Sequence, residues 1–212
     1  MEVFISGEDP VTLATIERLL SYVSSDFIIM MEIPARGGEI KSKIPQCNKL
    51  AKEYPVIMLL DADDKCAPEL KNKLLNGIQK EDNFILNICV DEAEAWLMAD
   101  RKGFANYFGI PIDSLPEARP LKQGGRRALM EMDFPAKSSL MLTHQYAIKS
   151  SKDNVRKTIG VTDLTAHCKG KEYNTTIIPF IKNNWDVGEA CKNSDSLQRM
   201  IARLKNLIQL NP

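Results

Sequence analysis

The fold is decided by the stretch Val56-Ile57-Met58-Leu59-Leu60-Asp61-Ala62-Asp63. Five consecutive apolar residues followed by an Asp-x-Asp pair are typical of a parallel strand that is buried on both faces and ends at a polar edge of its sheet. Similar apolar runs occur at residues 3–6, 27–33 and 84–90, and helix-period segments fill the intervals. This alternation predicts an α/β fold, a parallel sheet flanked by helices.

Helix boundary signals agree with this order. Asp9 before Pro10 is an N-cap followed by proline at the first helical position, so we expect a helix from Pro10 to about Ser24. After the fourth apolar run, a longer helix is expected from about Glu92, with a break at Gly103.

The texture changes near residue 110. Six glycines and prolines between residues 109 and 125 suggest a linker between an α/β domain over 1–110 and a basic, mostly helical region over 111–212. The whole chain has 28 basic and 28 acidic side chains, yet residues 1–100 contain 10 basic and 18 acidic ones. Residues 101–212 contain 18 basic and 10 acidic ones. Such a charge asymmetry indicates that the two halves of the chain have different roles.

Acidic clusters follow three of the four predicted strands. They are Ser6-Gly7-Glu8-Asp9, Asp61-Ala62-Asp63-Asp64 and Asp91-Glu92-Ala93-Glu94. In an open parallel sheet, ligands bind at the carboxyl ends of the strands. Carboxylate oxygens are preferred ligands of Mg²⁺, so the clusters predict a divalent-cation site. The alternative is that these acids form turns and helix caps.

The third cluster allows only one metal-facing glutamate if its helix has begun. Glu92 and Glu94 would then lie about 200° apart around the helix axis. We therefore expect one of them, with Asp91, near the metal and the other on the surface. Favourable placement of negative charge at a helix N-terminus is the competing explanation.

These residues resemble a TOPRIM domain, a Rossmann-like α/β fold. The resemblance rests on the Gly7-Glu8-Asp9 turn, on residues 56–63 and on the segment Asp91-Glu92-Ala93-Glu94-Ala95-Trp96-Leu97-Met98-Ala99-Asp100, and it covers about residues 1–108. More narrowly, the chain looks like the small stand-alone TOPRIM proteins related to the OLD-family nucleases.

The resemblance implies specific roles. Glu8 would be a general acid/base and metal ligand, and Asp61 and Asp63 would hold Mg²⁺ or Mn²⁺ for phosphodiester chemistry. Glu92 is the further candidate metal ligand and Glu94 the further candidate catalytic residue. The first motif departs from the TOPRIM pattern, because Ser6-Gly7 stands where Glu-Gly is usual, and this leaves catalytic competence open.

A carboxylate site that acts on nucleic acid needs cations to hold the phosphates. The candidates are basic residues near glycines or in the basic half; a solvated surface is the alternative role for each of their clusters. They are Arg36, Lys122, Arg126, Arg127, Lys152 and Arg156.

Together these features predict a Mg²⁺- or Mn²⁺-dependent nuclease or related phosphodiester-processing enzyme that acts on nucleic acid. The resemblance adds a separate partner ATPase and a role in DNA repair or phage defence. The alternative is a non-catalytic TOPRIM-like or receiver-like binding module. No apolar run reaches the length of about 18 residues that spans a membrane, so a cytoplasmic protein is expected. The sequence leaves a homo-oligomer open.

Overall fold

The computed structural model describes residues 1–35, 38–62, 65–121, 129–163, 168–170 and 172–211. The chain forms two compact units. Unit 1 comprises residues 1–90 and 199–212, and unit 2 comprises residues 91–198. We describe each unit by itself.

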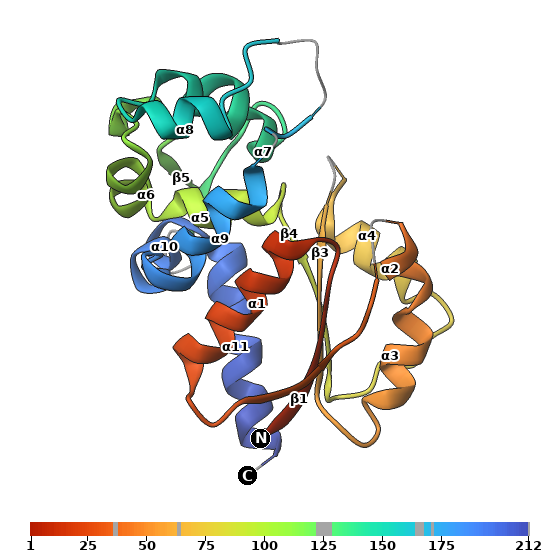
Figure 1. Ribbon diagram of the computed structural model, residues 1–212. Helices are drawn as coiled ribbons and strands as arrows, with labels where there is room; N and C mark the ends of the chain where they lie inside the picture. Colours follow the sequence, from red (N-terminus) through yellow and green to blue (C-terminus); the bar gives the residue numbers. More distant parts are fainter. Residues whose placement is uncertain (36–37, 63–64, 122–128, 164–167, 171, 212) are drawn as a thin grey trace. The chain divides into compact units, whose positions relative to one another are not determined.

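Unit 1 contains a four-stranded parallel sheet with the strand order β2-β1-β3-β4 (Figure 1). The strands are β1 (Glu2–Gly7), β2 (Ile28–Glu32), β3 (Val56–Asp61) and β4 (Phe84–Cys89). They coincide with the four apolar runs of the sequence. The prediction of an α/β fold with a parallel sheet and flanking helices is therefore confirmed.

Helices cover both faces of this sheet (Figure 1). On one face lie α1 (Pro10–Val23) and the part of α11 (Asp195–Leu210) that belongs to unit 1. On the other face lie α2 (Glu39–Ser42), α3 (Ile44–Leu50) and α4 (Ala67–Leu74). Strands β1, β3 and β4 are thereby enclosed between two helical layers.

The start of α1 is fixed by the predicted cap. The Asp9 carboxylate accepts a hydrogen bond from the Thr12 backbone N–H at 2.8 Å, and the Thr12 hydroxyl oxygen accepts one from the Asp9 N–H at 3.0 Å. This reciprocal pair is a capping box. Pro10 occupies the first turn, and Ser24 is the C-cap, so both predicted ends of the helix are confirmed.

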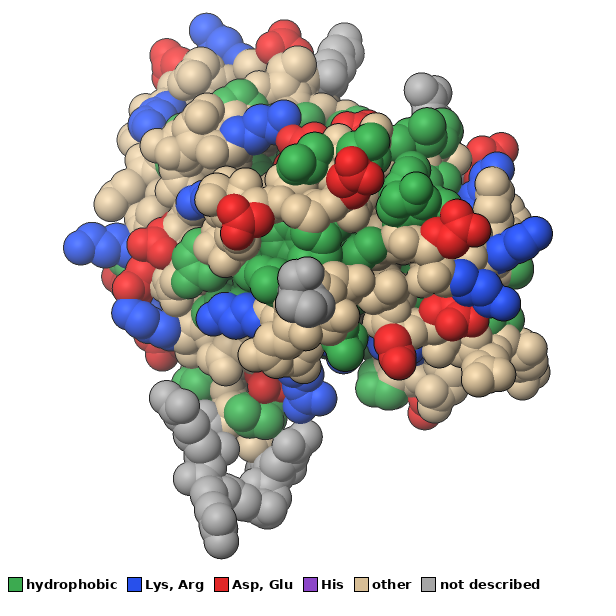
Figure 2. Space-filling view, turned by 90° about the horizontal axis from the view of Figure 1, so that it is seen from below, with side chains coloured by type: hydrophobic (Ala, Val, Ile, Leu, Met, Phe, Trp, Pro, Cys, Tyr) green, Lys and Arg blue, Asp and Glu red, His purple; other side chains and the backbone are tan. Residues whose placement is uncertain are grey.

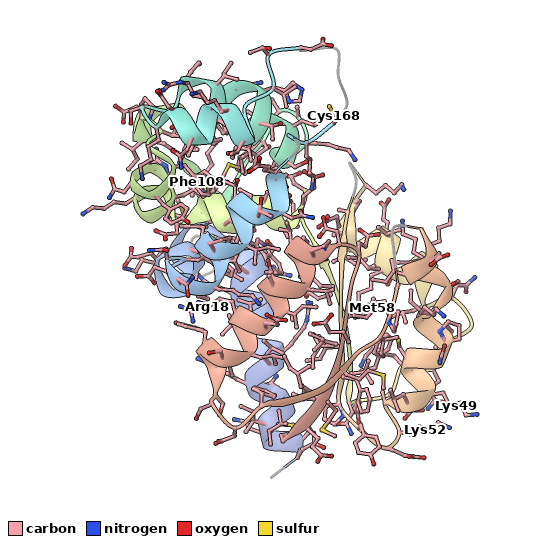
Figure 3. The ribbon with its side chains drawn as sticks, viewed as in Figure 1. Arg18, Lys49, Lys52, Met58, Phe108 and Cys168 are labelled. Carbon is pink, nitrogen blue, oxygen red and sulfur yellow. The ribbon has the colours of Figure 1, made fainter. Side chains whose placement is uncertain are left out.

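The alternating side chains of β3 and β4 build a core beneath α2, α3 and α4. Met58, labelled in Figure 3, packs in a cluster with Leu60 and Leu86 of the strands and with Ile44 and Cys47 of α3. All five side chains are fully or almost fully buried, at 0–1% exposure. The continuous apolar runs are explained by burial on both faces of the central strands.

Strand β2 corrects the expectation that all four strands are buried. Ile28, Met30 and Met31 are 57%, 50% and 56% exposed, and every residue of β2 is exposed. β2 is an edge strand that pairs with β1 alone among the described residues, and, unlike the other edge strand β4, it has no described helix packed closely against it. The apolar sequence of this strand does not reveal that it lies at the edge.

Unit 2 is mostly helical, as predicted, and contains one small antiparallel sheet formed by β5 (Ala118–Pro120) and β6 (Met130–Met132). Two further α-helices, α5 (Ala93–Ala99) and α6 (Arg101–Phe108), precede this sheet. The other helical segments of unit 2 are η1 (Ile112–Ser114), α7 (Ser138–Met141), η2 (Leu142–Tyr146), η3 (Ala147–Lys149), α8 (Asp153–Thr158), α9 (Tyr173–Asn183) and α10 (Val187–Asn193).

Aromatic rings form part of the core of unit 2. Phe108, labelled in Figure 3, lies with its ring centroid 4.4 Å from that of Phe104 and 5.3 Å from that of Phe180. All three side chains are fully buried. Helices α6 and α9 are therefore joined by ring packing.

Two expectations for this part of the chain need correction. The helix after β4 breaks at Asp100, whose carboxylate accepts the Gly103 N–H at 3.0 Å and caps α6; Gly103 lies inside α6. The described part of the expected linker contains η1 and β5, so it is folded within unit 2. The division between the units falls after Val90, because α5 packs against α10 and α7 of unit 2.

Candidate functional site

The connections of unit 1 create a switch point at the carboxyl edge of its sheet. Strand β1 leads into α1 on one face, whereas β3 leads into α4 on the opposite face (Figure 1). The two strands are neighbours in the sheet. Where connections leave adjacent strands toward opposite faces, a crevice opens outside the strand ends, and ligands of such folds bind there.

Two predicted site residues meet at this switch point. Glu8 follows β1 directly, and Asp61 is the last residue of β3. The Glu8 Oε2 atom accepts a hydrogen bond from the Asp61 backbone N–H at 3.1 Å. Asp61 is 8% exposed, and Glu8 is half-buried. The structure thus brings the first and second acidic clusters together, as their positions in the sequence predicted.

The residues before Glu8 explain why the acidic residue follows the end of β1 and does not lie within the strand. Ser6 is fully buried, and its hydroxyl donates to the Ile33 carbonyl at 3.2 Å. At Gly7, a Cβ atom would lie 2.6 Å from the Thr12 hydroxyl oxygen and 2.9 Å from the Leu13 nitrogen. The Ser6 side chain is therefore used in a hydrogen bond within the sheet region, and Gly7 allows the close approach of α1. Glu8 is the next residue whose side chain can reach the carboxyl edge of the sheet.

The donor set at this edge suits a hard divalent cation. Mg²⁺ is commonly held by one or two carboxylates together with water and substrate phosphates. Glu8 and Asp61 supply two carboxylates, and Asp63, the third predicted ligand, lies outside the described residues. Among the described residues, no group of three or more His, Cys, Asp or Glu side chains is arranged to hold a metal ion.

Glu92 of the third cluster lies in unit 2 and caps a helix there. Its Oε2 atom accepts the Ser139 backbone N–H at 2.7 Å and the Ser138 hydroxyl at 3.3 Å, at the start of α7. The side chain is 6% exposed. A carboxylate in this position satisfies an N–H group that the helix leaves unpaired. The metal-ligand role of Glu92 stays a prediction.

Glu94 is also buried, at 1% exposure. Its Oε1 atom accepts hydrogen bonds from the Lys169 ammonium at 2.8 Å and the Tyr173 hydroxyl at 2.7 Å. The Lys169 Nζ atom lies 4.9 Å from the centroid of the Tyr173 ring. The expectation that one of the two glutamates lies on the surface is wrong, because unit 2 provides hydrogen-bond donors for both. The catalytic role of Glu94 stays a prediction.

The distinctive Trp96 of the same segment belongs to another helix cap. The Trp96 Nε1–H donates to the Ser196 hydroxyl at 2.8 Å, and Glu131 accepts the Ser196 N–H at 2.8 Å and the Ser194 hydroxyl at 2.6 Å. Burial raises the pKa of Glu131 above its ordinary value, and the hydrogen bonds from Ser194 and Ser196 oppose that rise. This part of the resemblance thus marks residues that hold unit 2 together.

The predicted nucleic-acid-binding residues fall into two groups. Lys152 and Arg156 lie in unit 2: the Lys152 ammonium donates to the Tyr107 carbonyl, and the Arg156 guanidinium contacts Asp153 and the Ser150 carbonyl. These contacts fix both side chains locally. The others lie outside the described residues; they are Arg36, Lys122, Arg126 and Arg127.

The sequence reasoning missed three lysines that line one pocket of unit 1. Lys41 of α2, Lys65 just before α4 and Lys73 within α4 line a pocket of about 300 Å³ that also includes Glu69. Lys65 follows Asp61 closely in the chain, and its N–H donates to the Ala62 carbonyl at 3.1 Å. The sequence offered one indication of these lysines, because Lys65 directly follows the second acidic cluster.

Charge is mixed on the molecular surface. On the face drawn in Figure 2, acidic and basic side chains are interspersed, with apolar side chains between them. The opposite charges of the two halves of the sequence therefore do not translate into separate patches on this face. None of the described helices combines the length and the apolar character needed to cross a membrane.

Unit 1 is thus a parallel α/β domain of the doubly wound kind in which two acidic residues, Glu8 and Asp61, are in contact at the switch point. The chain belongs to the family described as a domain of unknown function (DUF4276), whose match covers residues 8–135 and so includes both Glu8 and Asp61. No curated protein and no solved structure matches the chain.

Proposed function

We propose that this protein is a metal-dependent nuclease or related phosphodiester-processing enzyme of the TOPRIM type. The observation that carries the proposal is the contact between Glu8 and Asp61, whose Oε2 and backbone N atoms lie 3.1 Å apart at the switch point of the sheet. A pair of acids brought together at the ligand-binding edge of this fold, from strands β1 and β3, is the arrangement that the TOPRIM resemblance implies.

Each residue has a role in this proposal. Asp61, with Asp63 two positions later, would hold Mg²⁺ or Mn²⁺. Glu8 would accept a proton from the attacking water, and the Asp61 N–H holds its carboxylate in place. When bound, the cation supplies Lewis-acid stabilisation of charge on the phosphate oxygens. Glu92 and Glu94 are buried in hydrogen bonds of unit 2, and we assign the chemistry to the edge of unit 1.

Cations near this edge would hold the polyanionic substrate. Lys41 and Lys65 of unit 1 would take this role, because lysine binds phosphates without regard to sequence. The phosphate-binding role of the basic residues named from the sequence stays a prediction. Contacts from both lysines would orient the nucleic-acid strand relative to Glu8 and Asp61.

The proposal is tested by cleavage of plasmid DNA and of RNA in the presence of Mg²⁺ or Mn²⁺. We expect metal-dependent cleavage by the intact chain and at least a hundredfold slower cleavage by Asp61→Asn, because the substitution removes a charged ligand but keeps the shape of the side chain. Glu53→Gln is the matched control, since Glu53 is exposed and lies before β3 at the opposite end of that strand.

Equal rates for the intact chain and Asp61→Asn would refute the proposed site. The resemblance also implies a separate partner ATPase, so the assay is run with and without the product of the neighbouring gene. Absence of cleavage in both arms would favour the alternative of a non-catalytic binding module. The buried Ser6, at the place where TOPRIM proteins usually have glutamate, is the observation that motivates that alternative.

A further inference from the structure

A second pocket of unit 1 lies along β4, the strand at the other edge of the sheet. It has a volume of about 210 Å³, and its walls include Phe84, Ile85 and Leu86. These residues begin β4, so the pocket lies at the amino end of the strand. Glu8 and Asp61 lie at the carboxyl end of the same parallel sheet. The pocket is therefore separate from the proposed phosphodiesterase site.

Three cationic side chains converge on this pocket from three segments. Lys71 comes from α4 on one face of the sheet, Arg203 from α11 on the other face, and Lys80 from the connection between α4 and β4. Asp82 is the acidic residue among the lining residues. Three cations and one carboxylate give the pocket an excess of two positive charges.

Several donors of these cations are unused by the described part of the protein. The Lys80 ammonium donates to the carbonyls of Glu81 at 2.7 Å and Phe84 at 3.0 Å, which leaves the third of its N–H groups. Arg203 donates from Nη1 to the Asn87 side-chain oxygen, and a guanidinium has five N–H groups. The Lys71 ammonium makes no hydrogen bond or ion pair with any described residue.

The mutual approach of these cations has an electrostatic cost. Burial lowers the pKa of Lys71 to about 8, and the charges of Arg203 and Lys80 contribute to the shift. Burial also lowers the pKa of Lys80 and of Arg203. Cations held together in a half-buried pocket lower one another's pKa values, and a bound anion would raise those pKa values again.

We propose that this pocket binds a small phosphate monoester, with the dianionic phosphate held by Lys71, Lys80 and Arg203. The organic part of the ligand would rest on the apolar walls, to which Phe84, Leu207 and Leu210 contribute. The excess of two positive charges matches a dianion, and the pocket volume limits the ligand to a phosphate with a small substituent.

The competing role for these cations is protection of an exposed strand edge, since lysines beside an edge strand discourage pairing with another chain. That role requires no ligand. If the pocket binds a dianion, its affinity should fall when Lys71 loses its charge. Protection of the strand edge predicts no such binding.

The test is calorimetric titration with sodium sulfate at pH 7 and constant ionic strength. Sulfate is the first probe because its charge stays at minus two across the pH range used. We expect saturable binding that is at least about tenfold weaker for Lys71→Met. Lys73→Met is the matched control, because Lys73 is on the same helix but lines the other pocket. The sulfate affinity of Lys73→Met should equal that of the unaltered chain.

Thermal unfolding shows whether Lys71→Met is folded. The substitution removes one of three like charges, so we expect a midpoint at or above that of the unaltered chain. Lys71→Gln provides a second neutral variant. Absence of saturable sulfate binding to the unaltered chain, or equal affinities for Lys71→Met and Lys73→Met, would overturn the proposal.

A pH series adds a readout that a structural role would not move. Lys71 faces Lys80 and Asp82 of the connection, Arg203 of α11 and the apolar start of β4. With a pKa of about 8, Lys71 loses most of its charge between pH 7 and pH 9, so sulfate affinity should fall about tenfold. Lys71→Arg stays charged and should keep its affinity at pH 9. An equal fall in both proteins would contradict the assignment.

The source of the phosphate is distinguished by competition. Inorganic phosphate and phenyl phosphate should displace sulfate, and phenyl phosphate should bind more tightly because its ring contacts the apolar wall. A single-stranded oligonucleotide without terminal phosphates offers only monoanionic diesters, and we expect no displacement. Displacement by that oligonucleotide that depends on Lys71 would overturn the choice of a monoester.

Discussion

At the scale of single residues, Gly7 controls the position of Glu8. A methyl group at Gly7 would approach the Thr12 hydroxyl and the Leu13 nitrogen to within 2.6 and 2.9 Å. We predict that Gly7→Ala lowers the free energy of unfolding by about 1–3 kcal/mol, because the Leu13 nitrogen is backbone and the Thr12 hydroxyl is held by its hydrogen bonds to Asp9. Denaturant unfolding of the two proteins measures the difference.

Gly38→Ala is the control for this prediction. Nothing lies within 4 Å of a Cβ at Gly38, and its φ of −60° suits alanine. The substitution should therefore be neutral or stabilise by about 0.4–1 kcal/mol. Equal effects at the two positions would show that the turn before Glu8 is not tightly packed.

At the scale of elements, helix caps in unit 2 depend on buried acids, and Glu131 of β6, which caps the start of α11, makes this testable. Burial raises its pKa above the ordinary value of 4.5. The folded state therefore favours the protonated carboxyl, and this contribution to stability is present below pH 4.5 and is lost as pH rises through the raised value. Glu131→Gln does not ionise, so the stability of the unaltered chain relative to this variant should fall as pH rises above 4.5.

Thermal unfolding between pH 4 and pH 8 checks this sign. Asp133→Asn is the control, since Asp133 is exposed and directly follows β6. The stability of the unaltered chain relative to Asp133→Asn should not show the fall expected for Glu131→Gln. A relative stability that rises with pH would mean that the bonds from Ser194 and Ser196 outweigh burial.

The elements also show what the sequence could and could not predict. The cap at Asp9 and Pro10 uses short-range chemistry, so both ends of α1 were predictable. The burial of Glu92 and Glu94 was not predictable, because their donors, Ser139 and Lys169, are far away in the chain and only the fold supplies them.

At the scale of the whole molecule, alternating apolar runs were sufficient to predict a parallel sheet, because central strands must be buried on both faces. Strand order was beyond this reasoning, and with it the exposure of β2 and the pocket beside β4. The chain also returns from unit 2 to unit 1 at Arg199 to complete the second helical layer. That return depends on long-range packing, which local periodicity does not encode.

The central claim is that Glu8 and Asp61 form a divalent-cation site at the switch point of unit 1. The most direct measurement is titration of Mn²⁺ followed by electron paramagnetic resonance, with the intact chain, Asp61→Asn and the exposed-site control Glu53→Gln. We predict a saturable Mn²⁺ site in the intact chain and in Glu53→Gln that is weakened at least about tenfold in Asp61→Asn. Equal Mn²⁺ binding by all three proteins, or none by the intact chain, would contradict the claim.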